Sequence, residues 1–440
     1  MTLSTALTRH DRGGNAVRLI MGLLAAPLAV VLLAGHVTVP SVAVTPPEVV
    51  TSPLPDPAIL AKKLKGVSTK GIGRTGVIVT TTDGRVLTSR SGSTPLTPAS
   101  TMKVLTAMAA LDILGPDRTF VTKAVDAGDG SVVLVGGGDP LLTSKTSTSS
   151  YKVASLTKLA TATATALKTA GKTSIRLRYD ASLFSGPTFS PAWKAKWRGY
   201  EARVAALEIN SGKLNNGRAA ANPPEHAANG FASRLRLAGI QVTSIAAGKA
   251  ASTSVELARV TSTPLTRILK RTLLISDNVA AETLLRHAAI ARSRTGSFTG
   301  ASANLKAWLG EHGLWEPGQR ILDGSGLAPA SRLTPKALAG AIRLALGSAE
   351  YAPVIAGLPV AGESGTLKNR FDDTSERAGR HTVHAKTGTL SGLAGLTGFV
   401  TTADGAVLVF AALGNQATSY YRVYDWLDRE AAVMARCGCR

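Results

Sequence analysis

The sequence predicts a mixed α/β fold of the α+β class, in which one domain is built from two parts separated by an insertion. A β-hairpin pattern lies near the start of the chain, and two further strand patterns and a helical segment lie near its end. The stretch from about Phe120 to Val260 has a different pattern, with hairpin-like pieces, alanine- and threonine-rich helical pieces and loops. At 440 residues, 44% hydrophobic and 18% charged, the chain can bury a full core.

The N-terminal segment has the pattern of an export signal. Three arginines within residues 9–18 precede Leu19–Gly35, a 17-residue run without a charged side chain. Ser41-Val42-Ala43 offers small residues for cleavage, whereas extending the run to Val44 gives the roughly 20 residues that span a bilayer. We predict export to the periplasm or cell wall, with residues 1–43 acting either as a cleaved signal peptide or as a retained membrane anchor.

Residues 44–57 are rich in proline, threonine and serine, which predicts a linker. The first part of the main domain, residues 58–122, begins with a short helix over about Ala58–Leu64. Gly76–Thr80 then has strand character and turns at Asp83-Gly84 into a second strand, as in a β-hairpin.

A helix is expected after this hairpin, with Thr97 as its N-cap and Pro98 in its first turn. Its apolar residues recur at helical spacing until Gly115-Pro116 ends it.

Residues 123–260 are predicted to form one or more inserted accessory domains, with a hairpin near Asp129-Gly130 and a helix over about Leu159–Leu167. The second part of the main domain, residues 261–440, should contain two strands joined at Asp404-Gly405. Its other expected elements are a helix ending at Ile275, a helix over Val279–Ala289, and a terminal helix over about Tyr420–Met434.

The formal net charge of +22 suggests anionic partners. The basic residues are scattered, and aromatic residues make up only 5% of the chain, so nucleic acid is not the expected partner. For an exported protein, anionic envelope polymers or a membrane surface fit this charge better.

Cysteine and histidine give no sign of a metal site. Cys437 and Cys439 are the only cysteines, and a single C-x-C pair without a second ligand pair is weak evidence for zinc. His381 and His384 are read as ordinary strand and loop residues. We predict no metal and no cofactor.

Ser100-Thr101-Met102-Lys103 is a candidate nucleophile and base on one face of a helix. A serine hydroxyl needs a base to take its proton, and a lysine pKa must fall by roughly 3 units to serve at neutral pH. That fall corresponds to about 4 kcal/mol, whereas a helix N-terminus supplies only about 0.3–1 kcal/mol. Burial and a second cation, for which Lys386 is a candidate, should supply the rest.

The same spacing occurs at Ser149–Lys152, in a Ser/Thr run, and at Ser155–Lys158, before a plausible helix. Ser100 is preferred because a hairpin precedes it and an apolar helix follows it.

Ser276-Asp277-Asn278 lies between two helical segments, where its hydroxyl and amide could project into a cleft. Ser276 could relay a proton to a leaving amine, and Asn278 could hold a substrate amide. The alternative is a helix-capping cluster, and Ser302-Ala303-Asn304 has the same spacing.

Lys386-Thr387-Gly388-Thr389 follows a segment of strand composition. Lys386 and the two threonine hydroxyls would bind a carboxylate, and Gly388 would let a substrate backbone approach closely. The backbone N–H groups of Ser100 and Thr389 would form an oxyanion hole.

With these three motifs in place, the chain resembles the class C penicillin-binding proteins, the D-alanyl-D-alanine carboxypeptidase/endopeptidase family, over roughly residues 58–435. Three glycine-rich segments also look like family segments, namely Gly136–Pro140, Asp323–Leu327 and Gly365–Leu367. The interval from Ser100 to Ser276 is far longer than in class A β-lactamases, and class C members carry accessory domains there. Ser364 departs from the aspartate common in this family before Gly-Thr-Leu.

The resemblance implies the fold shared by penicillin-binding proteins and serine β-lactamases: an antiparallel sheet flanked by helices, an all-helical lobe and the inserted domains. It also implies a penicillin-sensitive serine D-Ala-D-Ala carboxypeptidase that acts on peptidoglycan peptides through an acyl-enzyme, with Ser100, Lys103 and Ser276 catalytic. Asn278 and the Lys386–Thr389 segment would bind substrate, and β-lactam antibiotics would inhibit.

Two alternatives stay open at this point: a β-lactamase-like hydrolase and a non-catalytic wall-binding protein. A β-lactamase needs a carboxylate for deacylation, and neither Glu311 nor Glu316 is followed by the expected asparagine.

Overall fold

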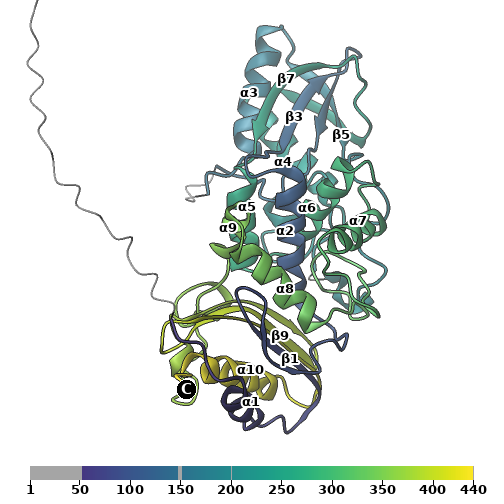
Figure 1. The fold of residues 1–440 in the computed structure, drawn as a ribbon. Coiled ribbons are helices and arrows are strands. Elements are labelled where there is room, and N and C mark those ends of the chain that lie inside the picture. Colours follow the sequence, from purple (N-terminus) through teal and green to yellow (C-terminus); the bar gives the residue numbers. More distant parts are fainter. Residues whose placement is uncertain (1–51, 147–150, 200, 440) are drawn as a thin grey trace, which may run out of the picture. The chain divides into compact units, whose positions relative to one another are not determined.

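The structure is a computed structural model that describes residues 52–146, 151–199 and 201–439 (Figure 1). The predicted signal or anchor and most of the predicted linker lie outside the described residues. Within those ranges, no helix is both long enough and apolar enough to cross a bilayer.

The main sheet joins strands from both ends of the chain in the order β2-β1-β10-β9-β8, with every neighbouring pair antiparallel. β1 pairs with β10 so that Val79 lies opposite Phe410. The hairpins predicted at Asp83-Gly84 and Asp404-Gly405 are confirmed. The strands are β1 (Ile72–Thr81), β2 (Val86–Arg90), β8 (Val383–Leu390), β9 (Leu393–Thr401) and β10 (Val407–Ala417).

Helices cover both faces of this sheet, because alternate strand residues point to opposite faces. Val79 and Phe410 pack with Leu60 of α1 (Pro57–Lys65) and Trp426 of α10 (Tyr420–Ala435). Ile78, one residue away, packs into a second core that also contains α8 (Pro335–Leu346). In Figure 1, α1 and α10 lie on one side of the sheet and α8 lies on the other.

The second core is a helical lobe built around α2 (Met102–Leu114), whose residues from Met102 to Leu111 are all buried. A helix that is apolar on every side is expected at the centre of a domain. The helices around it are α5 (Leu265–Leu274), α6 (Asn278–Ala291), α7 (Phe298–Glu311) and α9 (Ala352–Ile355).

The predicted start of this central helix is wrong in one detail. Thr97 does not cap it: the Thr97 hydroxyl donates to Pro329 O at 3.1 Å and accepts from Arg332 Nη1 at 2.7 Å. The chain instead makes a 3₁₀ turn, Ala99–Thr101, before α2 begins. Tertiary hydrogen bonds to a distant segment have taken the hydroxyl that a local cap would use.

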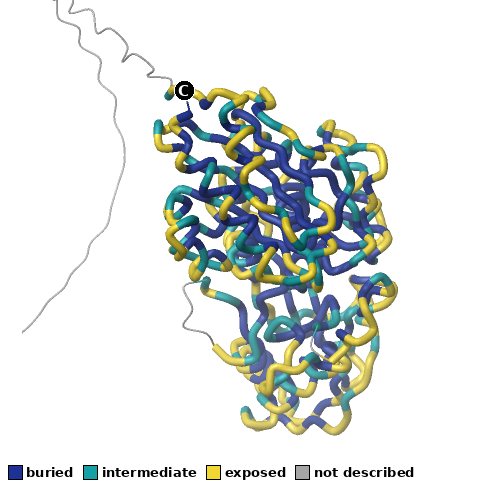
Figure 2. The backbone as a smooth tube through the Cα atoms, turned by 90° about the horizontal axis from the view of Figure 1, so that it is seen from below, coloured by how far each residue is buried: buried dark blue, intermediate teal, exposed yellow. Residues whose placement is uncertain are grey.

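A second, mixed sheet has the order β6-β5-β4-β3-β7. Helices α3 (Leu156–Thr169) and α4 (Pro223–Leu237) pack on it through a core that includes Leu177 and Phe231. Buried segments run through this unit as well as through the main body (Figure 2). Its strands are β3 (Val121–Asp126), β4 (Ser131–Val135), β5 (Ser174–Asp180), β6 (Gln241–Ala247) and β7 (Val255–Thr261).

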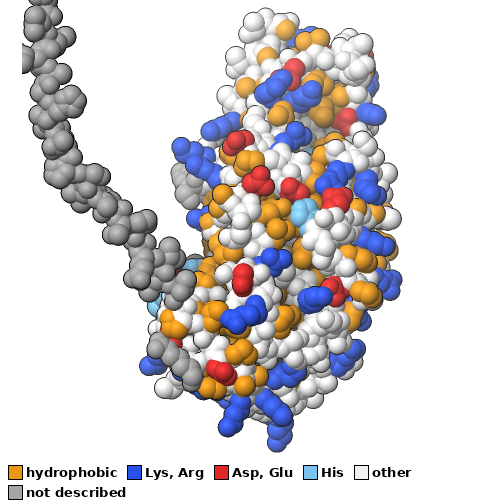
Figure 3. Space-filling view, viewed as in Figure 1, with side chains coloured by type: hydrophobic (Ala, Val, Ile, Leu, Met, Phe, Trp, Pro, Cys, Tyr) orange, Lys and Arg blue, Asp and Glu red, His pale blue; other side chains and the backbone are white. Residues whose placement is uncertain are grey.

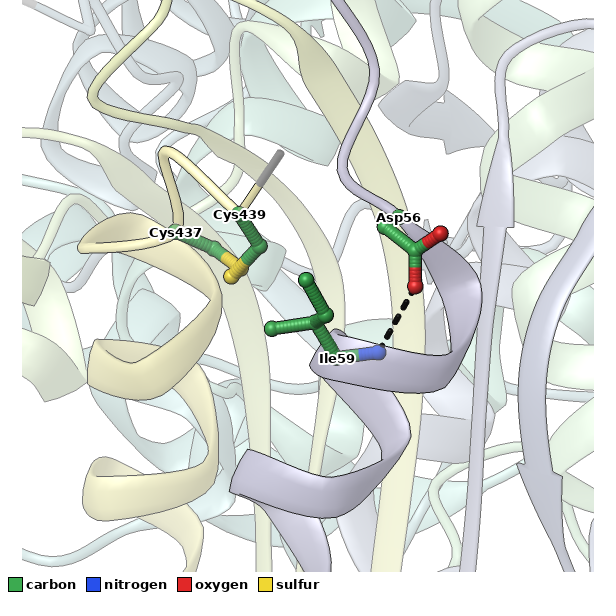
Figure 4. The surroundings of a disulfide bond; sticks show 4 residues. All are labelled: Asp56, Ile59, Cys437 and Cys439. Atoms are coloured by element: carbon green, nitrogen blue, oxygen red, sulfur yellow. Dashed lines mark hydrogen bonds between the residues drawn. A yellow bond between two sulfur atoms is a disulfide. The ribbon is translucent and has the colours of Figure 1, made fainter.

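The C-terminus is tied to the first described helix (Figure 4). Cys437 and Cys439 form a disulfide beside Ile59. Asp56 N donates to Cys439 O at 2.6 Å, and Asp56 Oδ1 accepts from Ile59 N at 2.8 Å, which caps α1. The two cysteines therefore serve a local structural contact.

Candidate active site

Ser100 and Lys103 lie where the 3₁₀ turn passes into α2, and their side chains meet. Lys103 Nζ is 2.8 Å from Ser100 Oγ. Ala99, just before Ser100, has a φ of 47°, a conformation that costs energy outside glycine and is common at functional sites. Two distant residues complete the surroundings of Lys103: its Nζ donates to Asn278 Oδ1 at 2.7 Å and to Ser325 O at 2.8 Å.

The electrostatics of Lys103 suit a base. Burial lowers its pKa from 10.5 to about 8, because a buried ammonium loses its hydration. The nearby carboxylates of Asp323, Glu282, Asp277 and Glu201 act in the opposite direction. The expected contribution of burial to the lowered pKa of Lys103 is thus present, and the repulsion between the two lysines lowers the pKa of Lys386.

Ser276, Asp277 and Asn278 form the break between α5 and α6. Ser276 has a φ of 58°, which turns the chain sharply. Asp277 caps α6 by accepting from Ala280 N at 3.0 Å and binds Arg271 Nη1 at 2.6 Å. The middle residue of the motif therefore fixes the turn, and its two neighbours face the cleft.

Lys386 reaches the same place from strand β8. Its Nζ donates to Ser276 Oγ at 3.0 Å and to Thr387 O at 2.8 Å. Its pKa lies well below the usual range, first because the side chain is buried and second because the charge of Lys103 repels it. A Cβ added at Gly388 would lie 2.6 Å from Pro98 O and 3.0 Å from Ser100 N, so only glycine lets β8 pass the nucleophile this closely.

The hydroxyls of Thr387 and Thr389 are held by residues that the sequence analysis did not assign. Thr387 Oγ1 is 2.7 Å from Thr366 Oγ1, and Thr389 Oγ1 contacts the Tyr424 hydroxyl. The unusual Ser364 accepts from Val360 N at 3.0 Å and so stabilises the turn that presents Thr366.

A cleft of about 600 Å³ opens over these groups. It brings together Ser100, Ser276, Asn278, Thr387 and Thr389. Leu327 and Thr366, from two of the glycine-rich segments noted in the sequence, also line it. Further lining residues were missed from sequence because no motif marks them: Trp197, Glu201, Arg370, Tyr420 and Tyr424.

Two of the missed residues come from the predicted insertion. Glu201 Oε2 accepts from Asn278 Nδ2 at 3.1 Å. Trp197 belongs to a small core in which Trp193 and Phe189 pack against Phe298 and Leu327 of the main body. The segment after β5 therefore leaves the second sheet and forms one wall of the cleft.

The competing serine motifs lie elsewhere. Ser155 is the N-cap of α3, where its Oγ accepts from Lys158 N at 3.3 Å, and the Lys158 side chain is exposed. Ser149 lies outside the described residues. Ser302 and Asn304 are within α7 and do not line the cleft.

The two glutamates considered for deacylation also lie outside the cleft. Glu311 pairs with Arg292 at 2.8 Å, and Glu316 pairs with Lys336 at 2.8 Å.

In the described part of the chain, one group of carboxylates is close enough to hold a metal ion: Asp373, Glu376 and Asp425, whose ligand atoms lie within 4.8 Å of one another. None of the three lines the cleft. Burial, and then the charge of neighbouring aspartates, raises the pKa of Glu376 to about 8. Nothing else at this group points to an ion.

Comparison with known proteins identifies the family of this chain. The D-Ala-D-Ala carboxypeptidase 3 (S13) family matches residues 60–217 and 211–428. The chain belongs to this family. Among its relatives, Carboxypeptidase DacB of Mycolicibacterium smegmatis is 35% identical over 379 residues, which is 83% of this chain and 81% of the relative. A D-alanyl-D-alanine carboxypeptidase of Actinomadura sp. is 28% identical over 431 residues, covering 77% of each chain.

The family fold is seen directly in a solved structure. Penicillin binding protein 4 (dacB) from Haemophilus influenzae superposes with a TM-score of 0.72 at 22% identity, covering 86% of this chain and 98% of that chain. This similarity confirms the fold predicted from the three motifs, and the family match confirms a serine peptidase of the class C penicillin-binding type.

Proposed function

We propose that the protein is a serine-type D-Ala-D-Ala carboxypeptidase/endopeptidase that cleaves peptidoglycan peptides through an acyl-enzyme. One observation carries the proposal: Lys103, fully buried, lies 2.8 Å from Ser100 Oγ, and Lys386 lies 3.0 Å from Ser276 Oγ in the same cleft. Membership of the family and the names of its relatives support the substrate class.

In the acylation step, neutral Lys103 takes the proton of Ser100 as its Oγ attacks the carbonyl carbon before the terminal D-alanine. The backbone N–H groups of Ser100 and Thr389 would stabilise the oxyanion, where one such donor is worth about 2.7–4 kcal/mol. Gly388 lets β8 pass close to the first of these donors, since an added Cβ would lie 3.0 Å from Ser100 N.

The leaving amine needs a proton as the C–N bond breaks. Ser276 can pass its own proton to the amine and take a replacement from charged Lys386, because its Oγ is hydrogen-bonded to Lys386 Nζ. The carboxylate of the terminal D-alanine would bind Lys386, Thr387 and Thr389, and its negative charge would keep Lys386 protonated in the substrate complex. Water then attacks the acyl carbon, the bond to Ser100 Oγ breaks, and the proton held by Lys103 returns to that oxygen. The released acid gives up its own proton, which restores the charge of Lys386.

A β-lactam follows the same first step. Its ring opens on Ser100, but the leaving amine stays tethered to the acyl group and blocks the approach of water. Penicillin is therefore expected to trap the acyl-enzyme.

The placement of the protein in the cell belongs to the same proposal. The N-terminal apolar run supports action outside the cytoplasm, and the net charge of +22 supports contact with anionic envelope polymers or a membrane surface rather than nucleic acid. Lysine and arginine side chains are spread over the face shown in Figure 3. We also propose residues 58–122 and 261–440 as the catalytic domain and 123–260 as its insertion, since the second sheet occupies that interval.

The test is labelling of the fragment that starts near Val44 with a fluorescent penicillin, alongside Ser100→Ala and Ser155→Ala. We expect a stable adduct in the wild type and in Ser155→Ala, and none in Ser100→Ala. A wild type that never labels but turns over nitrocefin rapidly would indicate a β-lactamase. A wild type that is silent in both assays yet binds cell walls would indicate a non-catalytic binding protein.

A further inference from the structure

A tight turn, Asp323–Ala328, contacts both the base and the residue before the nucleophile. Ser325 O accepts from Lys103 Nζ at 2.8 Å. At Gly326, whose φ is 81°, an added Cβ would lie 1.9 Å from Ala99 O, so the turn is packed directly against the backbone that precedes Ser100. A shift of this turn would move an acceptor of the base.

Glu282, on α6, holds the turn by its backbone. Its Oε1 accepts from Ser325 N at 2.7 Å, and Gly324 N lies 3.0 Å from each of its two carboxylate oxygens. The side chain is fully buried, and Thr106 Oγ1 adds a bond to Gly324 O at 2.6 Å. The Gly324–Ser325 peptide group, which directly precedes the one that presents Ser325 O, is thus fixed from both sides.

Asp323 holds the following peptide group, which carries Ser325 O, and the end of the same turn. Its Oδ1 accepts from Gly326 N at 3.1 Å, and its Oδ2 accepts from Ala328 N at 2.7 Å. Trp193 Nε1, from the inserted segment, also donates to Asp323 Oδ2 at 2.8 Å. Glu282 and Asp323 therefore hold the two peptide groups on either side of the Ser325 Cα, next to the base.

The direction of the Lys103 lone pair depends on where the turn places Ser325 O. A neutral amine has two N–H groups and one lone pair. Asn278 Oδ1 and Ser325 O accept the two N–H groups, which leaves the lone pair directed at the Ser100 hydroxyl. If Ser325 O is lost as an acceptor, the amine can rotate and donate to Ser100 instead of accepting its proton.

We propose that Glu282 is a positioning residue for acylation: by holding the Gly324 and Ser325 N–H groups, it fixes the backbone that leads into Ser325 O and so helps to orient the lone pair of Lys103 toward Ser100. This inference rests on the proposed function, since it assigns a role to Glu282 in the attack of Ser100.

Glu282 can affect Lys103 in two ways, by orienting its amine and by shifting its pKa, and the charges around Lys103 allow the two effects to be separated. Asp323, Glu282, Asp277 and Glu201 face it as carboxylates and raise its pKa, and Lys386 is the neighbouring cation. Burial, and then Asp323, raises the pKa of Glu282 itself to about 7, so Glu282 is ionised in alkaline solution. Removal of its charge should lower the pKa of Lys103 and leave more of the base neutral.

The experiment measures the rate of acylation by a penicillin against pH for the full chain and for Glu282→Gln. Glutamine keeps the shape but removes the charge and one acceptor oxygen. We expect the plateau rate above about pH 9 to fall on the order of 10- to 100-fold, as small misplacements of catalytic groups do. The acid limb should move to lower pH, and the dissociation constant of the pre-covalent complex should stay unchanged.

Glu430→Gln is the matched control, because Glu430 is equally buried and accepts hydrogen bonds from Arg90 and Trp426 on the far side of the main sheet. Its plateau rate should equal that of the wild type. If Glu282→Gln does not fold, Glu282→Asp replaces it, because aspartate keeps the charge but withdraws the carboxylate by about 1.5 Å, one C–C bond. That variant should lower the plateau without moving the acid limb.

Three results would overturn the inference. In Glu282→Gln, an unchanged plateau with a shifted limb would make the role of Glu282 purely electrostatic. A plateau lowered equally in Glu282→Gln and Glu430→Gln would make it a general effect of losing a buried carboxylate. A wild type that is not acylated at all would overturn the proposed function as well as the inference. The first two results would overturn the inference alone, so the two failures can be told apart.

Discussion

The same serine-to-lysine spacing occurs at Ser100–Lys103 and at Ser155–Lys158, in two regions that use it differently. In the first, the lysine is fully buried and its Nζ meets the serine hydroxyl at 2.8 Å. In the second, the serine Oγ accepts from the backbone N–H of Lys158, and the lysine side chain points to solvent.

The difference lies in the helices that carry the two motifs. α2 passes through the centre of the helical lobe and is covered on every side, whereas α3 packs only one face against the second sheet. A buried lysine loses hydration and becomes a usable base, while an exposed one remains a solvated cation. Whether the lysine of this motif can serve as a base therefore depends on how its helix is packed.

The sharpest test of this contrast replaces each lysine by methionine, which keeps the length and removes the amine. Lys103→Met should reduce the rate of penicillin acylation by about 10²–10⁴-fold, the range for loss of a general base. Lys158→Met should have no effect. Stopped-flow acylation measures both, and equal rates in the two variants would remove Lys103 from the mechanism.

The pH dependence of acylation should follow Lys103 and not the exposed lysine. The base must be neutral to act, and burial lowers its pKa to about 8. The rate should therefore level off above about pH 8 and fall about tenfold for each pH unit below that value. A profile that keeps rising to the ordinary pKa of lysine, about 10.4, would show that Lys103 is not the base.

The first region also has supports that the second lacks, and Thr366 is one of them. Thr366→Val removes the partner of the Thr387 hydroxyl at 2.7 Å. One hydrogen bond is worth about 0.5–1.5 kcal/mol, so KM for a D-Ala-D-Ala peptide should rise about 2- to 10-fold. Thr366→Ser keeps the hydroxyl and should restore KM, and a KM unchanged in the valine variant would contradict this role.

Mutation of Ser155 in the second region should change the stability of the protein and not its activity. Ser155→Ala removes the cap of α3 and should destabilise the protein by about 1 kcal/mol in chemical denaturation. Ser155→Asp, another good cap, should recover most of that loss. A Ser155→Ala variant that stays fully stable but loses penicillin labelling would reverse the roles of the two motifs.

Much of the fold could be predicted from local patterns in the sequence. The hairpin turns at Asp83-Gly84 and Asp404-Gly405 and the central helix ending at Gly115 depend on residues close together in the chain, and all are present in the structure. Thr97 was mistaken for a cap because its partners, Pro329 and Arg332, lie more than two hundred residues away.

In the site, too, residues in a local motif could be predicted and residues defined by long-range contacts could not. The residues with a motif, such as Ser100 and Lys386, could be named from sequence, and the structure places them around one cleft. Glu201, Glu282 and Tyr424 could not, because a carboxylate or phenol without a motif becomes informative only when tertiary packing shows what it contacts.

The disulfide at the C-terminus has a consequence outside folding. It encloses a single intervening residue, so the loop-entropy argument gives it only about 1.6 kcal/mol of stabilisation. Thiols generally stay reduced in the cytosol and become oxidised beyond the membrane. Because oxidation makes the C-terminal peptide about 2 Da lighter, mass spectrometry of that peptide would report the compartment in which each molecule matured.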